Sequence, residues 1–288
     1  MKPIVVVKRP AGFGSNFLQA LDWWWYSEDT GVPVYIDWNE NGRNIFDDFF
    51  EQKHPRPNGE VDVVEGYYGF NKHSTPEIDI LRYNRMSAYK KYNKFLFCSS
   101  GLYHESTLLG IRFFFHQVMK ENLKYSMPMI EKLKPHLLRK SDLNNCLGVH
   151  SRFFGHYFTK FGPSEPLSNS MSKDEFYSKN IEQIKQRLYQ GNYGQIYLAC
   201  DDAPFFDECV REFGDILLHH QYTRTSGDWM TKRKSYSDEM FDALVDILNL
   251  TACNEMVGCV SNFTFMVLVF QPFLRFQLFN TLNGVYTG

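Results

Sequence analysis

The stretch Cys146-Leu147-Gly148-Val149-His150-Ser151-Arg152 is an apolar run that ends in a histidine and an arginine on alternate positions. The run predicts a buried strand whose last residues, His150 and Arg152, point to the same face. Open α/β sheets bind their ligands at the carboxyl ends of their strands, where this pair stands. A guanidinium at that place has the permanent charge and the fork geometry that suit a phosphate. The alternative is a structural arginine that pairs with a carboxylate at the domain surface.

The chain after this strand alternates between helical and extended patterns, which predicts a doubly wound α/β domain. Ser172-Lys173-Asp174-Glu175 is a capping box at a helix start, and Pro204 fits the first turn of a later helix that Gly214 stops. In order, the expected elements are a strand at 146–150, a helix from 172, a strand at 195–200, a helix at 204–213, a strand at 215–218, a helix at 237–252, a strand at 255–260 and a helix from 262.

The first half of the chain shows a similar unit. Residues 4–7 and 34–38 predict two strands, and a helical pattern from about Asn16 to Asp29 lies between them, which favours parallel pairing. Residues 106–138 are helical in character. We therefore expect an α/β fold of the GT-B type, with two Rossmann-like domains facing each other across a cleft. The expected domains are 1–140 and 141–288, and one larger α/β sheet is the alternative.

Composition and charge limit the classes of partner. The net charge is −2, from 31 basic and 33 acidic residues without long runs, so we expect no nucleic-acid partner. No stretch approaches the ~20 apolar residues of a membrane span, so we expect no integral membrane contact and a cytoplasmic location. The six cysteines form no C-x-x-C pair, so we expect free, buried thiols and no metal or redox site.

Two further segments have features of anion-binding loops. Ser261-Asn262-Phe263-Thr264 lies where a strand hands over to a helix, so its backbone N–H groups and the helix dipole would suit a diphosphate. The alternative is an ordinary helix cap. Phe13, Gly14, Ser15 and Asn16 follow Gly12 between a strand and a helix, and these glycines would let a ligand approach closely. The alternative for this second segment is a plain tight turn. Within the helix that follows, one residue of Trp23-Trp24-Trp25 is a candidate acceptor contact.

Acidic residues follow two of the expected elements. Asp201 and Asp202 end a strand on the ligand side, although Asp202 is also placed to cap the next helix. Asp242 and Asp246 are four residues apart and share a helix face that differs from the core face of Met240, Leu244, Ile247, Leu248 and Thr251. A solvated surface is the simpler interpretation of that acidic pair.

These segments together resemble the fucosyltransferase superfamily, which includes α1,6-fucosyltransferases, nodulation fucosyltransferases and protein O-fucosyltransferases. The resemblance covers residues 145–272, and more faintly 11–38. The blocks that carry it, in order, are Gly12-Phe13-Gly14-Ser15-Asn16, Gly148-Val149-His150-Ser151-Arg152, Ile196 to Asp202, and Leu244 to Thr264.

The resemblance implies roles for these residues. His150 would help to hold the nucleotide, Arg152 the β-phosphate and Asp246 the base. Phosphate binding would involve the loop from Ser261 through Asn262 and Phe263 to Thr264. The implied reaction is an inverting, metal-independent transfer from a nucleotide-sugar donor to a glycan acceptor, with no cofactor. Domain 141–288 would bind the donor, and domain 1–140 would lie on the acceptor side.

The chain also departs from the family pattern. Phe153 replaces the second arginine of the family strand, and Lys160 stands where a family acidic residue is proposed as the catalytic base. The donor is therefore GDP-fucose or another GDP- or UDP-linked pentose or deoxyhexose, such as xylose. Candidate bases are His156, whose ordinary pKa suits proton transfer, Glu165 and Asp37. The alternatives in function are a catalytically silent glycan- or nucleotide-binding protein of the same fold and a sulfotransferase-like enzyme.

Overall fold

The computed structural model describes residues 2–65, 105–152, 172–222, 224, 235–259 and 261–279, with backbone only for 105–111 and 278. The chain divides into two compact units, one of residues 1–135 with 268–272 and the other of residues 136–267 with 273–288. The chain passes between the units after residues 135, 267 and 272, and the second of these boundaries falls within helix α12 (Asn262–Phe270). The predicted domain boundary at 140/141 stays a prediction.

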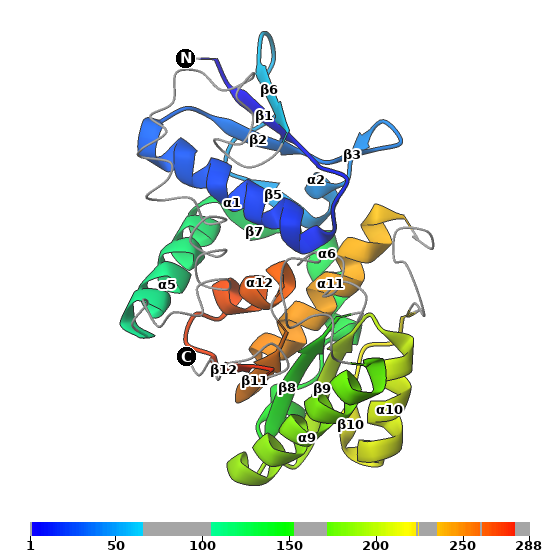
Figure 1. Ribbon diagram of the computed structural model, residues 1–288. Coiled ribbons are helices and arrows are strands. Elements are labelled where there is room, and N and C mark those ends of the chain that lie inside the picture. The colour runs from blue at the N-terminus through cyan, green and yellow to red at the C-terminus, as the bar shows by residue number, and fades with distance from the viewer. Residues whose placement is uncertain are drawn as a thin grey trace. The chain divides into compact units, whose positions relative to one another are not determined.

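The first unit contains a three-stranded parallel sheet in the order β2-β1-β6 (Figure 1). Val7 at the end of β1 is in register with Asp37 on one side and with Glu65 on the other. The elements of this unit are β1 (Ile4–Val7), α1 (Phe13–Thr30), β2 (Val34–Asp37), β3 (Asn39–Glu40), β4 (Arg43–Asn44), α2 (Phe46–Phe49), β5 (Phe50–Gln52), β6 (Asp62–Glu65), α5 (Glu105–Asn122), β7 (Leu123–Tyr125) and α6 (Met127–Leu133). The parallel unit expected from residues 4–38 is confirmed.

Aromatic rings form much of the core of this unit. Phe17 on α1 packs against Trp24 and Phe50, with ring centroids 5.8 and 6.0 Å apart, and Phe46 lies 4.8 Å from Trp38. All of Trp23, Trp24 and Trp25 are buried in this core, and the expectation that one of them contacts an acceptor stays a prediction. The expected helix over 106–138 is interrupted, because residues 123–125 form β7 and pair with β5 instead.

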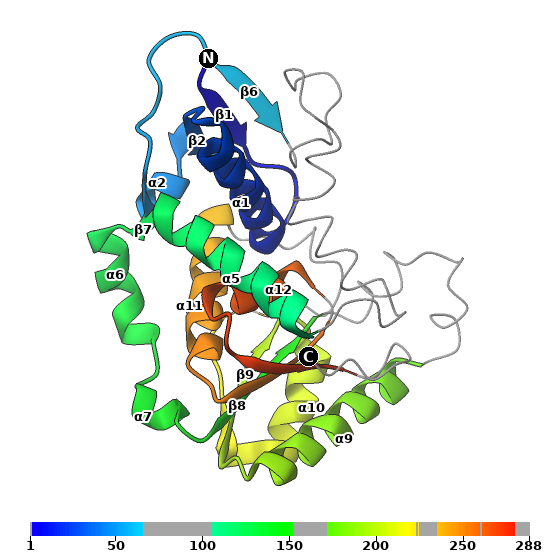
Figure 2. The same ribbon diagram turned by 90° about the vertical axis from the view of Figure 1, so that its left-hand side faces the viewer.

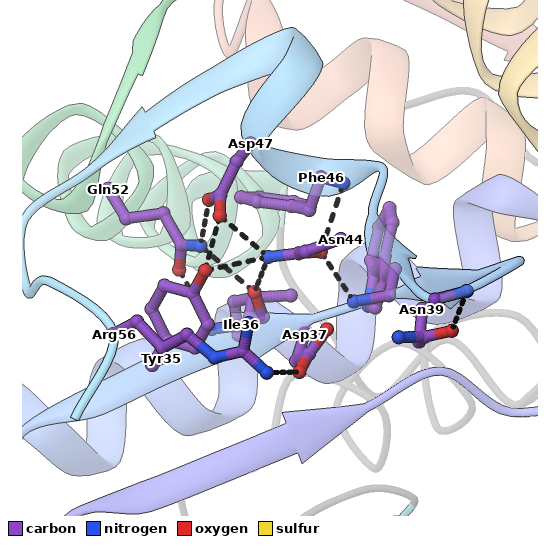
Figure 3. A network of polar contacts seen from close by, with 11 residues as sticks. Tyr35, Ile36, Asp37, Asn39, Asn44, Phe46, Asp47, Gln52 and Arg56 are labelled. Carbon is purple, nitrogen blue, oxygen red and sulfur yellow. Dashed lines mark hydrogen bonds and ion pairs between the residues drawn. The ribbon is translucent and has the colours of Figure 1, made fainter. Parts of the chain in front are cut away.

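Side-chain amides complete the outer edge of β2 (Figure 3). The Gln52 Oε1 accepts from the Ile36 N–H at 2.8 Å, and its Nε2 donates to the Ile36 carbonyl at 2.9 Å. The Asn44 Oδ1 accepts from the Trp38 N–H at 2.8 Å. Asp47 holds both amides, since its carboxylate accepts from Gln52 at 2.7 Å and from Asn44 at 2.9 Å.

The second unit is built on a five-stranded sheet with the order β10-β9-β8-β11-β12, in which every pairing is parallel. Its elements are a 3₁₀ turn (Lys134–His136), α7 (Lys140–Leu143), β8 (Cys146–Ser151), α9 (Lys173–Gly191), β9 (Gln195–Cys200), α10 (Ala203–Phe213), a 3₁₀ turn (Gly214–Ile216), β10 (Leu217–Leu218), α11 (Tyr236–Thr251), β11 (Glu255–Gly258), the start of α12, and β12 (Arg275–Leu278). This order is that of a Rossmann fold, so the expected doubly wound sheet is confirmed.

Helices cover both faces of this sheet (Figures 1 and 2). Leu147 and Val149 of β8 pack in one cluster with Phe176 of α9 and Phe205 of α10. On the opposite face, Gly148 lies so close to Leu250 of α11 that a Cβ at Gly148 would be 3.0 Å from its side chain. The capping box is confirmed, because the Ser172 hydroxyl accepts from the Glu175 N–H at 3.1 Å.

Some features differ from expectation. The strand expected at 215–218 is only Leu217–Leu218, because a 3₁₀ turn takes up 214–216. The five cysteines among the described residues are free and buried, as expected. No helix in the part of the chain that the structure describes is long and apolar enough to cross a membrane.

Replacing Gln52 tests the edge of β2. In Gln52→Leu the buried Ile36 N–H has no partner, so we expect the free energy of unfolding to fall by about 1–3 kcal/mol. Urea denaturation measures this change. Glu51→Gln, at an exposed position on the same strand, is the control and should change stability by at most about 0.5 kcal/mol. Equal effects of the two substitutions would contradict the role given to Gln52.

Candidate functional site

The candidate site lies where the strand order of the second unit reverses. From β8 the chain continues to β9 and β10 on one side, and later to β11 and β12 on the other. His150 near the end of β8 is in register with Gly258 at the end of β11. Ligands of open α/β sheets bind at such switch points, outside the carboxyl ends of the strands. The residues predicted from strand 146–152 and from loop 261–264 therefore meet at one place.

His150 is held on several sides there. Its Nδ1 lies 2.8 Å from the Thr264 Oγ1, and its ring stacks on Phe263 with centroids 4.4 Å apart and planes at 28°. The residue is only 5% exposed. Burial, with the nearby charge of Arg152, lowers the pKa of His150 well below its ordinary value, so the imidazole is neutral.

The start of α12 is capped by a serine. The Ser261 Oγ accepts from the Thr264 N–H at 3.0 Å, and the Thr264 hydroxyl donates to the Cys259 carbonyl at 2.6 Å. The cap interpretation of Ser261 is thus confirmed. Because this cap occupies the Thr264 N–H, that N–H is not available to an anion at this helix end.

Arg152 and Asp201 come together at the ends of β8 and β9. The Arg152 Nε lies 3.4 Å from the Asp201 Oδ2, and the two side chains are 21% and 36% exposed. The structural alternative for Arg152, an ion pair with a carboxylate, is therefore present. The pair nevertheless stands at the carboxyl edge of the sheet and keeps some access to solvent. A carboxylate at Nε orients the guanidinium plane, as bidentate phosphate binding requires.

Asp202 does not cap the helix that follows it. It occupies the N-cap position of α10, but its side chain makes no cap hydrogen bond. The Asp202 carboxylate instead accepts from the Tyr177 hydroxyl of α9, in a fully buried position. Burial and this carboxylate raise the pKa of Tyr177. The cap interpretation of Asp202 is wrong because tertiary packing supplies a phenol as the partner.

Asp246 is buried, so a solvated surface is the wrong interpretation for it. Its carboxylate accepts from the Tyr197 hydroxyl of β9 at 2.7 Å. Burial raises the pKa of Asp246 to about 7, although the hydrogen bond from Tyr197 acts to lower it. Its helix neighbour Asp242 lies 2.9 Å from the His220 Nε2. Helix periodicity misassigned this face because the segment after β10 covers it.

That covering segment contains residues that sequence reasoning missed. The Tyr222 hydroxyl and the Arg224 Nε both donate to the Cys200 carbonyl at the end of β9, at 2.8 and 3.1 Å. The Arg224 guanidinium also lies over the Phe206 ring, 3.7 Å from its centroid. The sequence shows this stretch only as a polar loop, and no spacing in it indicates that it folds back over β9.

The predicted residues of the first unit lie in the first turn of α1. Phe13 and Asn16 are buried there, and Gly14 and Ser15 are helical, so the expected loop is wrong. The Asn16 Oδ1 accepts from the Arg9 N–H and its Nδ2 donates to the Ala11 carbonyl, both at 2.8 Å. The amide of Asn16 therefore holds the turn between β1 and α1, and a role of these four residues in donor binding stays a prediction.

The candidate bases are only partly covered by the structure. His156 and Glu165 lie outside the described residues. Asp37 ends β2 and lies 3.5 Å from the Arg56 guanidinium, and its Oδ1 is buried without a hydrogen-bond partner among the described residues. Within the described ranges, no group of three or more His, Cys, Asp or Glu side chains is arranged to hold a metal ion.

Comparison with known proteins finds similarity in structure. The chain matches NodZ α-1,6-fucosyltransferase soaked with GDP-fucose at 15% identity and a TM-score of 0.55, covering 100% of this chain and 99% of that one. Fucosyltransferase NodZ from Bradyrhizobium matches at 15% identity and a TM-score of 0.54, and the match covers 99% of this chain and 98% of that one. POFUT1 in its apo form matches at 13% identity and a TM-score of 0.50, and the match covers 96% of this chain and 97% of that one. No family model matches the sequence, and no curated protein sequence does.

These likenesses confirm the expected α/β fold with parallel sheets. The structural matches with NodZ cover nearly the full length of this chain and of the matched chains. The resemblance in sequence, by contrast, covers residues 145–272 best. The arrangement of two domains across a cleft stays a prediction.

The buried Asp246 predicts a pH dependence of stability. Its pKa in the folded chain, about 7, lies above the ordinary value of 3.8, so the folded state binds the proton more tightly. The contribution of the protonated Asp246 carboxyl to the free energy of unfolding is therefore fully present below about pH 4 and is lost as the pH rises through about 7. Asp246→Asn removes this titration.

The difference in free energy of unfolding between Asp246→Asn and the unmodified chain should grow in favour of the variant from pH 4 to pH 7. Urea denaturation at a series of pH values measures it. Glu182→Gln, at an exposed position on α9, is the control and should give a flat difference. A flat difference for Asp246→Asn as well would show that this carboxyl titrates normally.

Proposed function

We propose that this chain is a glycosyltransferase that moves a sugar from a nucleotide-sugar donor to a hydroxyl of a glycan. The observation that carries the proposal is the meeting of His150, the Arg152–Asp201 pair and the capped start of α12 at the switch point of a Rossmann-type sheet. Among the donors considered, GDP-fucose is the best supported, because the fold matches that of a fucosyltransferase soaked with it.

The chemistry of the proposed site suits a leaving diphosphate. In an inverting transfer the acceptor oxygen forms a bond to the anomeric carbon while the bond from that carbon to the β-phosphate oxygen breaks. The electron pair leaves with the nucleoside diphosphate, whose charge must be stabilised, and the proton of the acceptor hydroxyl passes to a general base, for which His156, Glu165 and Asp37 are the candidates. Arg152 and the N–H groups at the start of α12 are the donors for that charge, each good donor being worth on the order of 3 kcal/mol in a preorganised site. We propose that these groups replace a metal ion.

A nucleotide screen tests the class of donor. We expect GDP to raise the melting temperature of the chain more than UDP or adenosine 3′,5′-bisphosphate does. A ligand at ~100 times its dissociation constant adds roughly 2.7 kcal/mol to the free energy of unfolding. Stabilisation by the bisphosphate alone would favour a sulfotransferase-like enzyme, and GDP binding without turnover of GDP-fucose would favour a silent binding protein.

Replacing Arg152 tests the mechanism. With GDP-fucose as donor, in excess EDTA, we expect Arg152→Ala to lower kcat/KM by about 10²–10³ while the melting temperature stays close to that of the unmodified chain. Arg211→Ala, which removes an exposed arginine of α10, is the control and should leave turnover unchanged. Near-normal turnover of Arg152→Ala would remove it from the site, and activity that appears only after addition of Mn²⁺ would contradict the metal-free mechanism.

A further inference from the structure

We infer that Thr264 is a positioning residue, which holds His150 as the Nδ1–H tautomer so that its Nε2 accepts a hydrogen bond from a hydroxyl of the bound nucleotide sugar. The inference rests on the proposed function, because it takes the ligand to be a nucleotide sugar. It makes that function more specific, since it states which kind of atom on the donor His150 contacts.

The tautomer follows from counting hydrogens around Thr264. Its hydroxyl lies 2.6 Å from the Cys259 carbonyl, an oxygen that can only accept. The single hydrogen of the hydroxyl is therefore used there. The Nδ1 of His150, 2.8 Å from the same hydroxyl oxygen, must then be the donor of that hydrogen bond. In the neutral imidazole, Nε2 carries the lone pair.

The surroundings leave the ring little freedom to turn. Ser261 accepts from the Thr264 N–H at 3.0 Å, which fixes Thr264 at the start of the helix. Phe263 covers one face of the imidazole. Gly258 gives Thr264 the room that it needs, because a Cβ at Gly258 would lie 3.2 Å from the Thr264 Oγ1. A single orientation of His150 is thus specified by contacts from β11 and α12.

The orientation decides what Nε2 can bind. Every group of the described residues within hydrogen-bond range of the His150 ring lies at Nδ1, namely Thr264, Ser261 and Cys259. An unprotonated Nε2 accepts hydrogen bonds, and a phosphate oxygen does so too, so the two do not pair. The ribose and the transferred sugar of a nucleotide sugar carry hydroxyls that donate. His150 therefore serves to recognise a hydroxyl, and the phosphates are left to Arg152.

The first experiment reads the tautomer by ¹H–¹⁵N NMR of His150 without ligand. We expect the hydrogen on Nδ1 in the unmodified chain and in Thr264→Ser, which keeps the hydroxyl. In Thr264→Val, which lacks it, the signal should shift toward the Nε2–H form. A hydrogen on Nε2 in the unmodified chain overturns the inference, and that result needs neither a folded Val variant nor a nucleotide that binds.

The second experiment measures affinity for GDP, 2′-deoxy-GDP, 3′-deoxy-GDP and GDP-fucose. His150→Asn is the matched variant, because its amide can still donate to Thr264 but has no counterpart of Nε2. In the unmodified chain, loss of the contacted hydroxyl should weaken binding by about 3–10-fold, and this difference should vanish in His150→Asn. Sensitivity to a deoxyribose identifies a ribose hydroxyl, and a preference for GDP-fucose over GDP that disappears in the variant identifies the sugar.

If the unmodified chain and His150→Asn show the same differences in affinity among the four nucleotides, the hydroxyl contact is overturned. The proposed function is left intact by that result. Failure of the unmodified chain to bind any of these four guanine nucleotides overturns GDP-fucose as the donor, and the hydroxyl contact proposed for it. The tautomer result distinguishes these cases, since it is obtained on the unliganded chain.

Discussion

The parallel pairing of β8 with β11 is the constraint on which the candidate site depends. It joins segments that lie more than 100 residues apart in the chain and places His150 beside Gly258 in register. A slip of one residue along β8 would turn His150 to the opposite face of the sheet and remove it from Thr264. The apolar residues that alternate with His150 prevent such a slip, because Leu147 and Val149 must stay in the core under α9 and α10. The same alternation thus specifies both the core and the site.

The polar side chains at this end of the sheet have partners within the second unit. Arg152 lies against Asp201, Asp202 accepts from Tyr177, Asp246 accepts from Tyr197, and His150 is bound to Thr264. Three of these contacts join a strand end to a helix or to the neighbouring strand, so the groups are already oriented before a ligand arrives. Preorganised dipoles of this kind stabilise developing charge without having to rearrange during the reaction. The buried carboxylates and phenols make this edge of the sheet rigid, and the partly exposed Arg152–Asp201 pair leaves it accessible to solvent.

Local signals in the sequence were sufficient for much of the second unit. The Ser172 cap, Pro204 in the first turn of α10 and the apolar strands each have a local physical cause, and each is where it was expected. Asp246 was misplaced because helix periodicity finds the most apolar face of α11, whereas tertiary contacts also buried a neighbouring face. Asp202 was misplaced for a related reason, since Tyr177 lies 25 residues away and no local pattern connects the two. The role of Asn16 in the turn before α1 depends on contacts back to Arg9 and Ala11, which composition does not reveal.

The amides of Gln52 and Asn44 along β2 have a consequence for association. A strand at the edge of a sheet normally offers its outward N–H and C=O groups to any other extended chain, and this is a common route to aggregation. Along this edge, the N–H and the carbonyl of Ile36 and the N–H of Trp38, just after β2, are already hydrogen-bonded to side chains. A foreign strand approaching this border would have to displace two amides that Asp47 anchors. The first unit can therefore keep β2 at the edge of its three-stranded sheet without pairing it to the strand of another chain.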